Sequence, residues 1–320
     1  MKWIVAATLT VLSWAGVSAH AQTWPAKPVR IIVPASPGGT TDITARLLAK
    51  KYSEALGQTF VVENRGGAGG MIGTEAALRA PADGYTIFFS SSSLSVNATL
   101  FGPKLKFDPT RDFAPVVWTS SVPLLLTLHP SVPAKSVKEL ALLSRQVHKG
   151  LNGGHNGSGT TSLIALEMYR QATGIALQSI SYKGGGPAAI ALLGGEIDFM
   201  FATLSTVKPH VEQGRLRALA VTTKKPSRIF PKLPTMDSMY PGFEADNWFG
   251  LFVLTAVSKD VITRLHALSI EALRTPELRE VITKDGSEIV ASTPEELGAH
   301  LRNEITRYAK VIKAGNITAE

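Results

Sequence analysis

Short apolar runs alternate with amphipathic stretches along most of the chain. Residues 29–33 form an apolar run of strand length, and Ala45, Leu48 and Tyr52 then recur at helical spacing. Further strand-like runs lie at 59–63, 85–89, 151–154, 180–182, 197–201 and 216–222. This alternation predicts an α/β protein with largely parallel sheets.

Two other apolar runs, residues 116–128 and 248–254, are placed to cross between two lobes. A chain of 320 residues is too long for one typical core. We therefore expect lobe 1 to comprise residues 22–121 and 250–320, and lobe 2 to comprise residues 122–249. The two crossing strands would serve as the hinge.

The first 21 residues have the form of a secretory signal peptide. Lys2 gives a positive start, an apolar stretch follows from Ile4, and Ala19-His20-Ala21 has the small-x-small pattern of a cleavage site. The apolar stretch is shorter than the roughly 20 residues that a membrane span needs. We predict removal of residues 1–21 and a periplasmic protein.

Composition limits the chemistry. The chain has no cysteine, which excludes disulfides, thiolate metal sites and a cysteine nucleophile. The net charge of +8 is spread along the sequence, and its densest basic run, residues 224–228, has no interleaved aromatic side chains. We therefore expect no nucleic-acid partner.

Nucleotide and metal motifs are missing from the sequence. The glycine-rich run after Glu63 fails the G-x-G-x-x-G pattern, because Ile72 stands where the third glycine is needed. No Walker motif and no metal-ligand spacing such as H-E-x-x-H occurs. We expect no cofactor and no metal.

Serine catalysis is an alternative that the sequence leaves open. The serine run 90–93, Ser158 and Ser162 sit at predicted strand ends, but Gly157-Ser158-Gly159 lacks the outer glycines of a nucleophile elbow. A triad assembled in space from distant residues would leave no local signature. A secreted hydrolase of small esters therefore remains the rival to a binding protein, although we expect no enzyme.

Three strand-to-helix turns, residues 36–42, 155–162 and 183–187, are rich in Gly, Ser and Thr. Free N–H groups at helix starts favour anions. A helix dipole contributes only about 0.3–1 kcal/mol, whereas micromolar binding requires about 8 kcal/mol. Several direct hydrogen bonds must therefore converge on the anion. The first turn belongs to one lobe and the other two to the second, so the pattern predicts an anion clamp between the lobes.

Ordered motifs carry a family resemblance. VPASPGGTTDITARLLA, VVENRGGAGGMIGTEAALRAPADGYT, GSGTTS, SYKGGGPA, GGEIDFMF, LRALAVTT and DNWFGLFV follow one another in the sequence. Together they resemble the Bug family, the extracytoplasmic substrate-binding proteins of tripartite tricarboxylate transporters. The resemblance implies a two-lobed Venus-flytrap of the type II periplasmic binding class. It also implies a small carboxylate ligand and membrane permease subunits as partners, and we expect a monomer.

The family pattern assigns ligand-binding positions to the turns of both lobes. From the first turn it implies Ser36, Gly38, Gly39, Thr40 and Asp42, from the second Gly159, Thr160, Thr161 and Ser162, and on the cleft floor Ser91 and Ser92. Lys183 of the third turn is a further candidate.

Departures from the family pattern bear on the ligand. Ala35 stands where an aromatic residue is usual, Leu163 replaces a histidine, and Thr203 falls within a usual Asp-Asn pair. His155 stands where a small residue is usual, so it is a candidate donor to an anion. These changes predict a roomier, less polar pocket and a ligand with one clamped carboxylate and a less polar remainder. A sensor domain instead of a permease remains an alternative partner.

Overall fold

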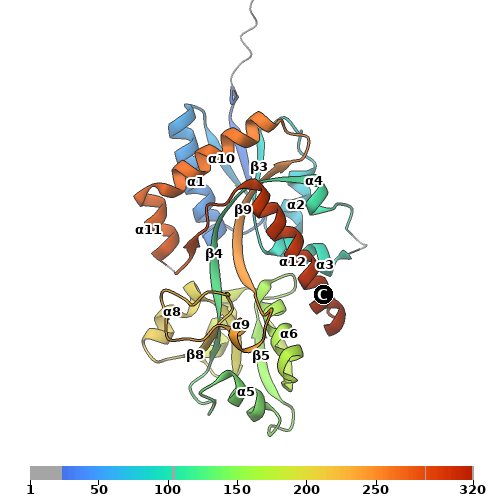
Figure 1. Ribbon diagram of the computed structural model, residues 1–320, viewed down its shortest axis with the longest axis vertical. Helices are drawn as coiled ribbons and strands as arrows, with labels where there is room; N and C mark the ends of the chain where they lie inside the picture. Colours follow the sequence, from blue (N-terminus) through green and yellow to red (C-terminus); the bar gives the residue numbers. More distant parts are fainter. Residues whose placement is uncertain (1–23, 103–104, 285, 319–320) are drawn as a thin grey trace, which may run out of the picture.

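The computed structural model describes residues 24–102, 105–284 and 286–318. The predicted signal peptide and its cleavage site lie outside the described residues. Figure 1 shows two lobes along the long axis of the molecule, with two long strands running from one lobe into the other. Within the described ranges, no helix has both the length and the apolar character that crossing a membrane requires.

Lobe 1 has a parallel sheet with helices in the connections. Strand β1 pairs in parallel with β2 and β3, and the strand order is β2-β1-β3-β9-β4. The carboxyl ends of its parallel strands, where the βα turns lie, therefore share one edge. The elements before the crossing are β1 (Val29–Val33), α1 (Thr40–Leu56), β2 (Phe60–Asn64), η1 (Ala68–Gly70), α2 (Met71–Leu78), β3 (Thr86–Ser91), α3 (Ser93–Leu100) and α4 (Pro109–Asp112).

Lobe 2 repeats this arrangement with its own parallel strands. Strand β5 is parallel to β6 and β7, and the order is β4-β7-β5-β6, with β8 also paired to β4. Its elements are α5 (Val137–Ser144), β5 (Leu151–His155), α6 (Thr161–Thr173), β6 (Leu177–Ser181), α7 (Gly185–Leu193), β7 (Phe199–Thr203), α8 (Leu204–Glu212), β8 (Arg217–Val221) and α9 (Met236–Met239). The strand-helix alternation predicted from the sequence is confirmed in both lobes.

Strands β4 (Phe113–Leu128) and β9 (Asp246–Leu254) connect the lobes. They pair antiparallel from Phe113 opposite Leu254 to Pro123 opposite Asp246, and β4 then continues beside β7 and β8. Both runs that the sequence placed between the lobes are strands. The lobe boundaries at 121/122 and 249/250 fall inside these strands and stay predictions.

The elements that follow β9 are α10 (Lys259–Arg274), α11 (Pro276–Lys284), β10 (Glu288–Ile289) and α12 (Pro294–Gly315). Helix α12 begins with a complete capping box, in which Thr293 Oγ1 accepts from Glu296 N and Glu296 Oε2 accepts from Thr293 N. The first turns of α12 pack on the core of lobe 1, while Val311 and Ile312 pack with Ile164 of α6 in lobe 2. The last helix therefore touches both lobes (Figure 1).

Candidate functional site

The first strand-to-helix turn is held by its own aspartate. Asp42 Oδ2 accepts from Gly38 N at 2.9 Å, and Arg46 pairs with the same carboxylate. Burial raises the pKa of Asp42, but hydrogen bonds from Arg46 and the Gly38 N–H outweigh that effect, and the net pKa is lowered. Asp42 is thus an ionised group that organises the turn.

A cavity of about 160 Å³, which we call the cleft cavity, lies between the lobes. Lobe 1 contributes the end of β3 and the start of α3, and lobe 2 contributes the turns after β5 and β7. Strands β4 and β9, which we call the hinge strands, close one end. The lining residues are Ser91, Ser92, Ser93, Leu124, Asn156, Thr160, Thr161, Ser162, Thr203 and Asn247.

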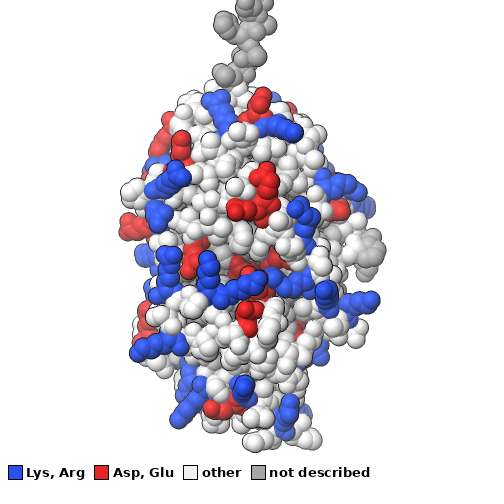
Figure 2. Space-filling model, in the orientation of Figure 1, with Lys and Arg blue, Asp and Glu red and all other residues white. Residues whose placement is uncertain are grey.

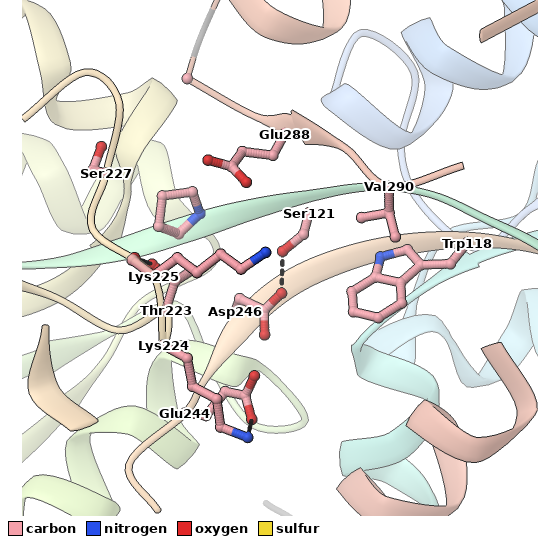
Figure 3. Close-up of a pocket in the computed structure, with 12 residues that line it drawn as sticks. Trp118, Ser121, Thr223, Lys224, Lys225, Ser227, Glu244, Asp246, Glu288 and Val290 are labelled. Atoms are coloured by element: carbon pink, nitrogen blue, oxygen red, sulfur yellow. Dashed lines mark hydrogen bonds and ion pairs between the residues drawn. The ribbon is translucent and has the colours of Figure 1, made fainter. Parts of the chain in front are cut away.

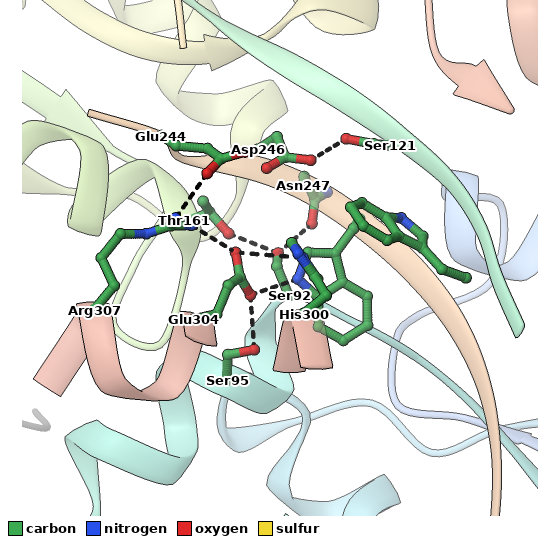
Figure 4. A network of polar contacts seen from close by, with 12 residues as sticks. Ser92, Ser95, Ser121, Thr161, Glu244, Asp246, Asn247, His300, Glu304 and Arg307 are labelled. Atoms are coloured by element: carbon green, nitrogen blue, oxygen red, sulfur yellow. Dashed lines mark hydrogen bonds and ion pairs between the residues drawn. The ribbon is translucent and has the colours of Figure 1, made fainter. Parts of the chain in front are cut away.

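A chain of hydrogen bonds crosses from one lobe to the other at the cleft cavity (Figure 4). Ser92 Oγ donates to Asn247 Oδ1 at 2.7 Å, and Ser92 and Thr161 hydroxyls lie 2.6 Å apart. Because a serine has one hydroxyl hydrogen and Ser92 gives it to Asn247, Thr161 is the donor of the second bond. The hydroxyls of the two lobes therefore bond to each other in this structure.

The turn before α6 uses its hydroxyls for local structure. Thr160 is the N-cap of α6; its Oγ1 accepts from Leu163 N and donates to Gly157 O at 2.7 Å. Ser162 Oγ donates to Phe201 O at 2.8 Å. The first two N–H groups of α6, those of Thr161 and Ser162, have no acceptor within the helix, so they are donors beside the cavity. A ligand anion would meet these N–H groups, while the hydroxyl hydrogens of Thr160 and Ser162 are already donated.

Gly159 of lobe 2 lies against Asn97 of lobe 1. A Cβ added at Gly159 would lie 2.5 Å from Asn97 Oδ1, and Gly159 has a φ of +75°. Both features require glycine at this position. Asn97 is fixed on the lobe 1 side, since its Nδ2 donates to Gly69 O at 2.7 Å.

The lining of the cleft cavity carries no formal charge among its described residues. Nine of its ten side chains are hydroxyls or amides, and Leu124 is the exception. Such a lining can hold an anion through hydrogen bonds, each about 1.5–3 kcal/mol to a charged group. Neither Ala35 nor Leu163 lines this cavity, so the less polar pocket predicted from them stays a prediction.

A second cavity, of about 280 Å³, lies on the other face of the hinge strands (Figure 3). Pro123 and Asp246 line it, whereas their neighbours Leu124 and Asn247 line the cleft cavity. Successive residues of a strand point to opposite faces, which puts the two cavities back to back.

Charge distinguishes the second cavity from the first. Its lining includes the carboxylates Glu244, Asp246 and Glu288, and one of its two lysines, Lys224, is paired with Glu244 at 3.1 Å. Figure 2 shows Lys and Arg side chains across the middle of this face, with Asp and Glu side chains among them. An organic anion would meet carboxylates here, so the cleft cavity is the better site for it.

A buried polar network ties α12 to the hinge on this same side (Figure 4). Glu304 of α12 accepts from Tyr308, Ser95 and the Trp248 indole, while Arg307 pairs with Glu244 at 2.8 Å. Burial raises the pKa of Glu304 to about 7, and the hydrogen bonds from Tyr308 and Trp248 act against it. Arg307 and Glu244 join the last helix to the segment entering β9.

His300 lies beside this network without acting in the cleft. Its ring stacks on Trp118 with ring centroids 3.9 Å apart. Burial lowers the pKa of His300 to about 4, so the imidazole is neutral at neutral pH. Within the described ranges, no group of three or more His, Asp or Glu side chains is arranged to hold a metal ion.

The structure brings part of the predicted site together. The predicted residues that line the cleft cavity are Ser91, Ser92, Thr160, Thr161, Ser162 and Thr203. The predicted residues that do not line it are Ser36, Gly38, Gly39, Thr40, Asp42, His155, Gly159 and Lys183. Ser36, Gly38, Gly39 and Lys183 are exposed, and His155 is buried at the end of β5 with its Nδ1 accepting from Gly157 N.

Sequence reasoning missed four lining residues, Ser93, Leu124, Asn156 and Asn247. Asn156 lies within a turn that the sequence singled out, and Ser93 within a serine run. Asn247 is a polar residue next to the apolar run of β9, which is the one signal that could have marked it. Nothing in the apolar run 116–128 distinguishes Leu124.

Comparisons with known proteins agree with this architecture. The family model described as tripartite tricarboxylate transporter family receptor matches residues 44–317. Protein BugT of Bordetella pertussis is 36% identical over 94% of this chain and 94% of its own length. Similar solved structures include one described as a periplasmic transporter and one described as periplasmic binding protein BugD.

Two similar solved structures contain an organic acid. Rpa4515 of R. palustris with adipate is 32% identical, with a TM-score of 0.81, over 92% of this chain and 99% of that one. MatC of Rhodopseudomonas palustris with bound malate is 28% identical, with a TM-score of 0.78, over 90% of this chain and 100% of that one.

Proposed function

The chain belongs to the tripartite tricarboxylate transporter receptor family, and we propose that it is a periplasmic receptor for one small organic carboxylate. It captures the acid in the cleft cavity and presents the closed form to membrane permease subunits. The protein performs no chemistry on its ligand. Export by the predicted signal peptide, residues 1–21, is part of this proposal.

The observation that carries the proposal is the uncharged, donor-rich cavity between two lobes joined by two strands. Similar proteins hold adipate and malate. Micromolar binding needs about 8 kcal/mol. At about 1.5–3 kcal/mol for each hydrogen bond to a charged group, roughly four bonds reach that value. The Asn156 and Asn247 amides, the Thr203 hydroxyl and the N–H groups at the start of α6 supply that many donors.

The size of the cavity favours a compact ligand. Pockets for drug-sized molecules typically enclose about 300–1,000 Å³, and the cleft cavity encloses about 160 Å³. A short aliphatic acid with polar substituents fits such a lining better than a bulky aromatic acid. This proposal differs from the bulkier, less polar ligand predicted from the sequence, and the screen that follows distinguishes the two.

A thermal-shift screen tests the function. Acetate, succinate, malate, adipate, citrate and benzoate are each added to the mature protein, with the methyl esters as neutral controls. A ligand at 100 times its dissociation constant stabilises the folded state by about 2.7 kcal/mol. We expect one short aliphatic acid to raise the melting temperature and its ester to leave it unchanged. The protein is first unfolded and refolded to remove any retained ligand. If no acid then raises the melting temperature, the proposal is contradicted.

The same preparation tests the rival hydrolase. A hydrolase serine needs a base, whereas Ser92 Oγ donates to an asparagine oxygen and Ser162 Oγ to a backbone carbonyl. We expect a serine-directed fluorophosphonate to leave the mass of the protein unchanged. A covalent adduct on a cleft serine would contradict the receptor function.

A further inference from the structure

Asn247 occupies the hinge end of the cleft cavity. It lies on β9 opposite Val122 of β4, where the two strands pass between the lobes. Its neighbours point to the other face, since Asp246 accepts from Ser121 and Trp248 donates to Glu304 of α12. The half-buried Asn247 side chain is thus the part of β9 that faces the cleft cavity.

The hydrogen bond to Ser92 orients the amide of Asn247. An asparagine side chain has an accepting oxygen and a donating NH₂ group. The oxygen Oδ1 accepts from Ser92 Oγ at 2.7 Å, so Nδ2 is the end left to face the cavity. The opposite rotation of the amide would instead present Oδ1 to the cavity, where it would repel a carboxylate. The two orientations therefore predict opposite ligand preferences.

We propose that Asn247 Nδ2 donates a hydrogen bond to the ligand carboxylate and makes the receptor prefer an acid over its amide. This assignment rests on the proposed function and names a residue of that site. The other donors belong to lobe 1 or to lobe 2, whereas Asn247 belongs to the hinge. Its partner Ser92 is in lobe 1, and Ser92 in turn accepts from Thr161 of lobe 2.

Contact with Asn247 links binding to closure. A ligand shifts a conformational equilibrium only by binding one state better than the other. The orientation of Asn247 depends on Ser92, and Ser92 meets Thr161 only when the lobes are together. The donor is thus fully oriented in the closed arrangement. An acid bound to Nδ2 therefore favours that arrangement.

The variant Asn247→Asp tests the assignment. It keeps an acceptor for Ser92, has nearly the same shape, and replaces the NH₂ donor with a negatively charged oxygen. Asn316→Asp is the matched control, because it makes the same change at an exposed position at the end of α12. Calorimetry measures the dissociation constants of adipate and malate for the wild type and both variants. Thermal shifts measure the effect of adipamide and malamide.

We expect Asn247→Asp to weaken the better of the two acids by about 10- to 100-fold, the range for one lost charge-assisted hydrogen bond. Asn316→Asp should remain within about twofold of the wild type, since surface charges contribute little. The amides should shift the melting temperature of Asn247→Asp at least as far as that of the wild type, because a carboxylate accepts from an amide NH₂. Without ligand, both variants should melt close to the wild type.

Three results would overturn the assignment. Unchanged acid affinity in Asn247→Asp would remove the residue from the site. Equal weakening of acids and amides would mean that Asn247 only supports the local structure. Tighter acid binding by the variant would mean that the carboxyl faces the cavity in protonated form. If the wild type binds neither these acids nor any other in the screen, the proposed function itself fails. If the wild type binds an acid and Asn247→Asp binds it equally well, only the assignment of Asn247 fails.

Discussion

Thr160 and Thr161 are adjacent and carry the same side chain, but their hydroxyls have different partners. Thr160 caps α6 and bonds only to its own turn, whereas Thr161 bonds to Ser92 across the cleft. The sequence assigned both to the ligand site for the same reason. Their separate roles follow from which way each side chain points at the start of the helix.

Thr160→Val should therefore affect stability more than binding. Loss of an N-cap hydroxyl costs about 1 kcal/mol, which for a chain of this size lowers the melting temperature by roughly 1–2 °C. Thr160→Ser keeps the cap and serves as the control. Differential scanning calorimetry measures both, and a variant as stable as the wild type would show that the cap contributes nothing.

Gly159→Ala should keep the lobes from meeting. The added methyl group would lie 2.5 Å from Asn97 Oδ1 and would also be forced into a positive φ. Gly57→Ala is the matched control, since it has a φ of +64° and open space around it. Both variants should lose about 1 kcal/mol of stability from the backbone alone. Only Gly159→Ala should also weaken ligand binding, by at least about tenfold, and equal affinities in the two variants would exclude the contact.

At the scale of elements, the hinge strands hold a carboxyl that is costly to ionise. Burial raises the pKa of Asp246 to about 6, and the hydrogen bond from Ser121 offsets this only in part. A carboxyl with a higher pKa in the folded protein binds more protons there than in the unfolded chain. Stability therefore falls as the pH rises from 3.8, the ordinary pKa of an aspartate, to about 6, and stays reduced above it.

Asp246→Asn should remove this pH dependence. Relative to the wild type, the free energy of unfolding of the variant should be higher at about pH 8 than at about pH 4, by up to about 3 kcal/mol. Asp260→Asn, at an exposed position in the first turn of α10, is the control. Thermal unfolding at the two pH values measures the difference. If the difference in the free energy of unfolding between variant and wild type is the same at both pH values, the carboxyl of Asp246 is ionised at little cost.

Helix α12 connects elements that the strand pattern keeps apart. Its beginning packs in lobe 1 with Leu301 among the core residues, and its end packs on α6, where Gln171 Nε2 donates to Val311 O at 2.9 Å. The amphipathic stripe of this helix was evident in the sequence. Its division between two lobes was not, because a stripe shows only that a face is buried, not against what.

For the whole molecule, α12 should limit how far the lobes separate. Ile312→Ala removes packing between α12 and α6, and Leu301→Ala removes similar packing within lobe 1. Each should cost roughly 2–4 kcal/mol of stability. Small-angle X-ray scattering of the ligand-free protein should show a larger radius of gyration for Ile312→Ala alone. Equal radii for both variants and the wild type would mean that α12 does not restrain the lobes.

Closure of the two lobes is also a property of the whole molecule. The Ser92–Thr161 bond and the Arg307–Glu244 pair hold the lobes together on the two faces of the hinge in this structure. The acid must therefore enter through a more open form, in which the Ser92–Thr161 bond is broken. Binding to Asn247 then favours the closed form, in which that bond is made again.

The sequence by itself determined the α/β class, the order of strands and helices, the two runs that cross between the lobes, and the family. These features depend on local periodicity, caps and ordered motifs, which are written in neighbouring residues. Only the tertiary structure decided which residues reach the cavity. Asp42 bonds within its own turn, the first turn supplies no lining residue, and Asn247 faces the cleft cavity because of the register between β4 and β9. Contacts of this kind join residues that are distant in the chain, and no local pattern specifies them.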